Sequence, residues 1–239
     1  MKNNKKSTHL IIGAGEVGRG LFKVLSARYR VFIRDIEGID FGIKKFDVLH
    51  IAYPYFKTFI AVSRKYINKY HPGLIINHSS VPVGVTSKLG KKAVHSPIRG
   101  VHPNLDKGIK TFVKYFGGPK SKEAADIFKC IGVLTHVVSR AEWTEAGKLW
   151  DTTQYGYSIT LNKEIWKWCQ KNKVPFEFVY GDFNKTYNEG YLKLGRSEVM
   201  RPYLKHVSGK IGGHCVIPNC NLLDSTISQE IIKKNKKLI

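Results

Sequence analysis

The stretch Gly13-Ala14-Gly15-Glu16-Val17-Gly18 decides the fold. It follows an apolar run, Thr8 to Ile12, and the apolar residues after it recur at the spacing of one helix face. Asp35 stands 17 residues after Gly18, just beyond a second apolar run from Tyr29 to Ile33. Strand, glycine turn, helix and a second strand ending in a carboxylate are the pattern of a dinucleotide-binding unit.

Each residue of this motif has a physical task. Gly13 permits the tight turn, Gly15 lets the backbone approach a pyrophosphate at the helix N-terminus, and Gly18 allows close packing of helix on strand. Asp35 accepts hydrogen bonds from ribose hydroxyls and favours NAD over NADP, because a carboxylate repels a 2′-phosphate. The adjacent Arg34 leaves NADP open. The residues that we predict to bind NAD are Gly13, Gly15, Glu16, Val17, Gly18, Asp35 and Ser79.

The rest of the chain alternates strands and helices before becoming helical. We expect further strands at Asp47 to Ala52, Leu74 to Asn77, Lys92 to His95 and Leu134 to Val138. Helices are expected at Phe56 to Tyr70, Ser121 to Ile131 with Ser121 as N-cap, Ala141 to Lys171 and Val174 to Gly195, and then a loop from Tyr203 to Leu223 before a last helix. The predicted class is α/β, a Rossmann-type doubly wound parallel sheet followed by a mainly helical region with a long central helix. Residues 1–139 would be the NAD-binding domain, and residues 140–239 a helical dimerisation and catalytic-loop region.

Composition and charge narrow the class of partner. The 239 residues are 42% hydrophobic and 24% charged, values typical of a folded globular protein. The net charge of +22 favours an anionic partner, but no nucleic-acid-binding motif accompanies it, so we expect a small anionic metabolite or a nucleotide sugar rather than nucleic acid. No apolar run is long enough for a membrane span, and four cysteines in a chain of this size indicate free thiols and a cytoplasmic location.

Polar groups gather in four further places. Ser79 and Ser80 follow an expected strand, at the sheet edge where ligands of open α/β sheets bind. Arg99 is suited to clamp an anion, and Lys148 is suited to act as a general base. An ordinary turn, a structural loop and a solvated lysine remain the alternatives for these three places. The run Gly212-Gly213-His214-Cys215 offers a thiol nucleophile, whereas a zinc site with Cys220 lacks a fourth ligand, so we predict no metal.

Taken together, these motifs resemble the nucleotide-sugar dehydrogenases that act on UDP-glucose, GDP-mannose and UDP-N-acetylhexosamines, within the 6-phosphogluconate-dehydrogenase-like superfamily. The resemblance covers about residues 8 to 223 and rests on the glycine turn with Asp35, on Ser79-Ser80-Val81-Pro82-Val83-Gly84, on Lys148-Leu149, and on Gly212-Gly213-His214-Cys215. It implies NAD as cofactor and oxidation of a primary alcohol through a thiohemiacetal and a thioester. By position it implies Cys215 as nucleophile, Lys148 as oxyanion partner and Ser80 in place of a water-positioning threonine. Arg99 and His214 are our expected substrate contacts.

Three catalytic positions depart from the family pattern. Thr152 stands where the family has asparagine, Asn219 where it has aspartate, and Ile98 where it has a glutamate base. The family also continues into a further domain that holds the nucleotide part of its substrate. We therefore expect an NAD-dependent oxidoreductase resembling a shortened UDP-sugar 6-dehydrogenase, acting on a small or differently held anionic alcohol. The alternatives are a catalytically degenerate dinucleotide-binding sensor or partner subunit, and a basic nucleic-acid-associated Rossmann protein.

The expected central helix contains an unusually large number of bulky apolar side chains. They are Trp143, Trp150, Ile159, Leu161, Ile165, Trp166 and Trp168. One small domain does not readily cover so many, and in the family this helix is the core of a dimer. A homodimer built on this helix is the prediction, and tryptophans that fill an intrachain core are the alternative.

Overall fold

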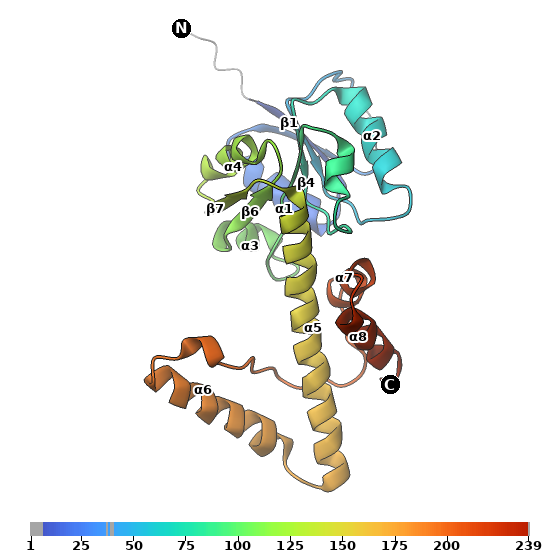
Figure 1. The fold of residues 1–239 in the computed structure, drawn as a ribbon. Coiled ribbons are helices and arrows are strands. Elements are labelled where there is room, and N and C mark those ends of the chain that lie inside the picture. The colour runs from blue at the N-terminus through green and yellow to red at the C-terminus, as the bar shows by residue number, and fades with distance from the viewer. Residues whose placement is uncertain (1–6, 37, 39–40, 239) are drawn as a thin grey trace. The chain divides into compact units, whose positions relative to one another are not determined.

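The computed structural model describes residues 7–36, 38 and 41–238, and it divides the chain into two compact units, Met1–Lys148 and Leu149–Ile239. The first unit contains a seven-stranded sheet in the order β2-β1-β3-β4-β5-β6-β7. Its strands are β1 (Thr8–Ile12), β2 (Arg30–Arg34), β3 (Val48–Ile51), β4 (Leu74–Asn77), β5 (Ala93–His95), β6 (Lys114–Gly117) and β7 (Thr135–Val138). The doubly wound α/β class expected from the sequence is therefore confirmed (Figure 1).

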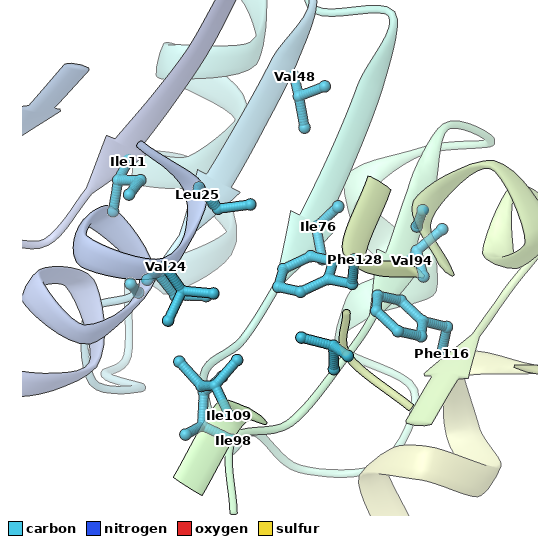
Figure 2. Close-up of a cluster of buried hydrophobic side chains, with 14 of the residues drawn as sticks. Ile11, Val24, Leu25, Val48, Ile76, Val94, Ile98, Ile109, Phe116 and Phe128 are labelled. Carbon is cyan, nitrogen blue, oxygen red and sulfur yellow. The ribbon is translucent and has the colours of Figure 1, made fainter. Parts of the chain in front are cut away.

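Apolar side chains alternate between the two faces of the sheet, because successive residues of a strand point to opposite sides. On β1, Ile11 belongs to one core cluster while Leu10 and Ile12 belong to the other. Figure 2 shows the first cluster, in which side chains from α1 and α4 meet those of the strands. The helical elements of the unit are α1 (Glu16–Leu25), α2 (Phe59–Tyr70), the 3₁₀ helix η1 (Thr86–Leu89), α3 (Leu105–Thr111) and α4 (Ser121–Lys129). Both faces are thus buried, as a doubly wound sheet requires.

One strand pair departs from the expected parallel sheet. Strand β6 runs antiparallel to β5, with His95 opposite Gly117, while the other pairs are parallel. Neither β6 nor α3 was expected from the sequence. A four-residue strand that begins with lysine and a seven-residue helix that contains glycine carry too little periodicity to be recognised. Helix α4 begins at Ser121 with Lys120 in the N-cap position, so the expected cap was wrong by one residue.

Helix α5 (Ala141–Asn172) is a single helix of 32 residues, as expected (Figure 1). The second unit continues with the π-helix η2 (Glu177–Asp182), α6 (Phe183–Lys193), the 3₁₀ turn η3 (Ser197–Val199), α7 (Val216–Leu222) and α8 (Thr226–Lys236). The expected loop from Tyr203 to Leu223 was therefore wrong in its last part, which is α7. Proline and two asparagines in this short helix conceal it from sequence reasoning.

A glycine inside α5 shows how the second unit packs. A Cβ on Gly156 would lie 2.6 Å from a methyl carbon of Val216, the first residue of α7. Val216 and Cys220 of α7 and Ile231 of α8 form a buried cluster together with Ile211. Gly156 is therefore a packing residue rather than a break in the helix. Among the helices of the described residues, none is long and apolar enough to cross a membrane.

Candidate functional site

The glycine turn between β1 and α1 is shaped by close backbone approaches. Gly13 has a φ of +106°, and a Cβ on it would lie 2.7 Å from the carbonyl of Ala52, just beyond β3. A Cβ on Gly18 would lie 1.8 Å from the Gly13 carbonyl oxygen. Both glycines are therefore required by the fold itself.

Gly15 differs from the other two glycines of the motif. It is exposed, its φ is −69°, and a Cβ on it would meet nothing within 4 Å. Among the described residues, no packing contact explains a glycine here. It directly precedes Glu16, the first residue of α1, where helical N–H groups lack intrahelical partners and favour an anion. The open space over Gly15 fits a pyrophosphate whose oxygens approach the backbone.

Two further residues of α1, Glu16 and Val17, are predicted to contact the cofactor, and the structure shows what each of them contacts within the chain. Glu16 pairs with Nδ1 of His102, which comes from the segment before α3. Val17 is half-buried and packs against the core cluster of Figure 2. Neither observation tests a cofactor contact, so both residues remain predictions.

Asp35 lies directly after β2 with its side chain exposed. One carboxylate oxygen accepts the backbone N–H of Ile36 at 3.0 Å, which holds the side chain close to the main chain. The neighbouring Arg34 donates from Nε to the backbone carbonyl of Asp35 itself at 3.3 Å. Its guanidinium donates to the Tyr70 hydroxyl at 3.1 Å and to the carbonyl of Gly38. Of the described residues Arg34 and Asp35 at this end of β2, Asp35 is exposed and Arg34 is half-buried.

The turn after β4 is built from buried hydrogen bonds. Ser79 is buried and donates its hydroxyl to the carbonyl of Tyr53 at 2.6 Å, while its own carbonyl faces His95 Nε2 at 3.2 Å. Ser80 is half-exposed, and the described residues offer its hydroxyl no hydrogen-bond partner. Of the two serines, Ser80 is thus the one whose hydroxyl is available to a ligand.

Glu145 is a residue that sequence reasoning missed. It is fully buried on α5, and its two carboxylate oxygens accept the backbone N–H groups of Gly84 at 2.6 Å and Thr86 at 2.8 Å. Burial raises its pKa, and these hydrogen bonds act in the opposite direction. The carboxylate ties the turn that follows Ser80 to α5. A glutamate among several helix carboxylates gives no sign of this in the sequence.

Lys148 lies three residues after Glu145 on the same helix and is half-buried. Its charge helps to lower the pKa of His95, which burial brings to about 3. His95 also faces the Thr144 hydroxyl at 2.8 Å. The charge of Lys148 thus acts on the polar groups at the end of β5, and its role as general base or oxyanion partner remains a prediction.

Arg99 lies between β5 and α3, with its guanidinium 5.4 Å from the centre of the Phe112 ring. A small surface pocket beside it is lined by Pro97, Ile98, Phe112 and Lys114. Ile98 is buried, so the position of the family's glutamate base carries an apolar core side chain. The role of Arg99 in binding substrate remains a prediction.

The cysteine loop belongs to the second unit. Cys215 is half-buried in the N-cap position of α7, and the preceding His214 is exposed. Gly213 has a φ of +81°, which explains one glycine of the motif. Ser80 and Lys148 belong to the first unit, and each unit is described by itself. The meeting of the three expected catalytic residues therefore stays a prediction.

Two departures from the family pattern meet inside the second unit. The side-chain amide of Asn219 donates to the hydroxyl of Thr152 at 3.1 Å, and both residues are buried. At the next residue of α5, the Thr153 hydroxyl lies 3.8 Å from the sulfur of Cys220, whose pKa is raised by burial. Within the described residues, no group of three or more His, Cys, Asp or Glu side chains is arranged to hold a metal ion.

Comparisons with solved structures show the fold. A UDP-D-ManNAc dehydrogenase from Pyrococcus horikoshii matches 96% of this chain and 68% of its own length, with a TM-score of 0.77 and 16% identity. A UDP-glucose dehydrogenase from Pyrobaculum islandicum matches 99% of this chain and 69% of its own, with a TM-score of 0.75 and 14% identity. A 3-hydroxyisobutyrate dehydrogenase from Mycobacterium tuberculosis matches 97% of this chain and 93% of its own, with a TM-score of 0.70 and 14% identity.

These comparisons confirm the resemblance in fold and leave the chemistry open. The chain spans about two thirds of the two sugar dehydrogenases but nearly all of the hydroxyacid dehydrogenase. No protein-family model matches the sequence, and no curated protein sequence matches it either. The chain has the Rossmann-like fold of these dehydrogenases.

Proposed function

We propose that this protein is an NAD-dependent oxidoreductase that resembles a shortened UDP-sugar 6-dehydrogenase and oxidises a small anionic alcohol. The observation that carries this proposal is the glycine turn. Gly13 and Gly18 are fixed by the fold, whereas Gly15 faces open space at the start of α1. That space suits the pyrophosphate of a dinucleotide, and the exposed Asp35 suits its ribose. The engagement of Arg34 by Tyr70 and Gly38 favours NAD over NADP.

The residues have separate tasks in this proposal. NAD, when bound, supplies the hydride acceptor. Glu145 holds the turn after Ser80, and Ser80 presents a hydroxyl to the substrate or to water. Lys148 takes the proton of the substrate hydroxyl as general base or stabilises the oxyanion. Arg99 and His214 bind the anionic part of the substrate.

The covalent version of the reaction assigns the nucleophile to Cys215. Its thiolate would attack the aldehyde carbon from which the hydride has left, so Cys215, Lys148 and Ser80 must reach one carbon. Carboxylates that would assist water attack are replaced by Ile98 and Asn219. We therefore propose oxidation that stops at the aldehyde, with Lys148 sufficient as the base for that single step.

A second candidate function is a catalytically degenerate dinucleotide-binding protein that serves as a sensor or partner subunit. The hydrogen bond from Asn219 to Thr152 favours it, because two altered catalytic positions now satisfy each other in a buried site. In both candidates, residues 1–139 form the NAD-binding domain and residues 140–239 the helical dimerisation and catalytic-loop region of a cytoplasmic homodimer.

Turnover assays separate the two candidates. The protein is incubated with NAD and a panel of anionic alcohols, both nucleotide sugars and small hydroxyacids, and reduced nicotinamide is followed. The oxidoreductase predicts reduction with at least one small alcohol, lost in Lys148→Met and retained in the surface variant Lys92→Met. Loss in Cys215→Ala as well would support the covalent route. NAD binding without turnover of any alcohol would reject the oxidoreductase and support the dinucleotide-binding sensor or partner subunit.

A further inference from the structure

Three buried histidines form a diagonal row across the sheet of the first unit. His9 on β1 pairs with Val48, and His50 lies two residues further along β3. His78 directly follows Asn77 at the end of β4, one strand over and again two residues along. Because side chains alternate with a period of two, all three lie on one face. His9 Nδ1 is 2.9 Å from His50 Nε2, and His50 Nδ1 is 3.0 Å from His78 Nε2.

The row ends on a buried lysine of β6. His78 Nδ1 lies 2.8 Å from the Ser96 carbonyl oxygen and 3.4 Å from Lys114 Nζ. Lys114 Nζ also donates to the carbonyls of Ser96 at 3.0 Å and Pro97 at 3.3 Å. Lys114 is 4% exposed and the three histidines 3% or less. We call His9, His50, His78 and Lys114 the ladder.

Hydrogen-bond chemistry determines where the protons of the ladder lie. A carbonyl only accepts, so the Ser96 bond requires a proton on His78 Nδ1 and leaves Nε2 as an acceptor. His50 must then donate from Nδ1, and so must His9. Every neutral imidazole therefore carries its proton on Nδ1. The row ends in His9 Nε2, a buried acceptor with no hydrogen-bond partner among the described residues.

Burial disfavours the charged form of every member of the ladder. Burial lowers the pKa of His9 to about 4, and it lowers the pKa values of His50 and His78 well below the usual value. Burial, together with the nearby charge of Lys148, also lowers the pKa of Lys114. The groups that face the ladder are Tyr29 and Asp47 at the His9 end, and His95, Lys148 and the rings of Phe116 and Phe128 at the Lys114 end.

We propose that the ladder is a proton relay that runs across one face of the sheet, from His9 on β1 to Lys114 on β6. With Lys114 as an uncharged amine, a proton that arrives on His9 Nε2 shifts a proton from His9 to His50 and another from His50 to His78. In the last step the Nδ1 proton of His78 leaves its bond to the Ser96 carbonyl and passes to the lone pair of Lys114 Nζ. One proton enters, one appears on the amine, and only N–H bonds break and form. The imidazoles change from the Nδ1–H to the Nε2–H form, and the reverse passage resets them.

At the Lys114 end, the amine is held inside the first unit by the carbonyls of Ser96 and Pro97. Lys114 is also one of the residues around a small hollow beside Arg99. An apolar side chain would fill the Lys114 position without leaving a buried amine among two aromatic rings. The presence of an amine there, joined to three aligned imidazoles, is the feature that packing alone does not explain. This inference goes beyond the proposed function and does not depend on dehydrogenase activity.

Imidazole nitrogen spectroscopy on the whole chain tests the relay. With nitrogen-15-labelled histidine, we expect His9, His50 and His78 to be neutral and mainly in the Nδ1–H form at neutral pH. Relaxation-dispersion measurements are expected to detect one minor Nε2–H state that all three share. In Lys114→Met this exchange is lost and the Nδ1–H form is locked, whereas Lys92→Met, which removes a lysine that donates to the Pro72 carbonyl outside the ladder, leaves it unchanged.

A second variant tests the relay independently if Lys114→Met does not fold. His9→Phe keeps a ring against Tyr29 but removes the entry atom, and it should freeze His50 and His78 in the Nδ1–H form. Two results would overturn the relay. One is a wild-type protein whose ladder histidines show a single form without exchange between about pH 5 and pH 9. The other is exchange that persists unchanged in Lys114→Met or in His9→Phe.

Discussion

Asn219 donates its side-chain amide to the hydroxyl of Thr152 across 3.1 Å in the interior of the second unit. These are the two positions at which the related dehydrogenases, by the sequence resemblance, carry aspartate and asparagine. The substitutions are thus compensated as a pair, because each buried polar group satisfies the other.

Removing either partner should therefore cost stability. Asn219→Ala leaves the Thr152 hydroxyl without this donor in a buried place and should lower the free energy of unfolding by about 1 to 3 kcal/mol. Urea denaturation of both single variants and of the double variant with Thr152→Val measures the coupling, which we expect to be about 0.5 to 1.5 kcal/mol. Additive losses would mean that the bond contributes nothing.

The glycines of the turn should separate folding from cofactor binding. Gly18→Ala places a Cβ against the Gly13 carbonyl and should destabilise the protein by about 1 to 3 kcal/mol or more. Gly15→Ala meets open space, so its cost should stay below about 1 kcal/mol, while NAD binding weakens. Thermal unfolding and NAD titration of the two variants check this. Equal stability losses in both would contradict the assignment of Gly15 to the ligand.

The stability of the protein should fall as the pH falls. The folded pKa values of His9 and His95, about 4 and about 3, lie below the unfolded value of about 6.5, so the unfolded chain binds more protons between these limits. The stability that these neutral histidines contribute is present above about pH 6.5 and is lost as the pH decreases toward 4. Each group adds up to about 1.4 kcal/mol per pH unit to the slope.

Urea unfolding between about pH 8 and pH 4.5 measures this slope. His95→Gln should reduce it by the share of one group, and the same change at the exposed His136 should leave it unaltered. Lys114 acts in the same direction at higher pH, because its lowered pKa makes the unfolded chain bind more protons up to about pH 10.4. Stability that does not change across this range would contradict the neutral, buried state of these groups.

The long helix predicts a dimer. Trp143, Trp150 and Trp168 are 57%, 47% and 56% exposed in the single chain, so they do not fill an intrachain core. Light scattering at micromolar concentration should give twice the 27.1 kDa of one chain. Trp150→Glu should shift the mass to that of the monomer, and Leu194→Glu, at an exposed apolar position outside α5, should not. A wild-type mass of 27.1 kDa would rule out the dimer.

The fold was predictable where local patterns were strong. The spacing of glycines and apolar residues predicts the glycine turn, the apolar strands and the 32-residue helix. Strands β1 and β4 begin and end at the predicted residues. Strand β6 was not predictable because four residues carry too little periodicity, and helix α7 was not because it contains a proline and two asparagines, which disfavour helix.

The candidate site was predictable only in part. Gly15 and Asp35 follow from a motif, but Glu145 and Lys114 act through partners far away in the sequence, such as Thr86 for Glu145 and Ser96 for Lys114. The ladder likewise joins residues 41 and 28 positions apart. Contacts at such separations leave no periodic trace in a single sequence.

Calorimetric titration with NAD tests the central claim most directly. The account predicts that the wild-type protein binds NAD and that Asp35→Ala weakens binding at least about tenfold, since losing hydrogen bonds to an ionised acceptor costs about 1.5 to 3 kcal/mol. The surface variant Asp126→Ala, whose carboxylate faces Lys129 on α4, should bind as the wild type does. A wild-type protein that does not bind NAD, or an Asp35→Ala protein that binds it equally well, would contradict the account.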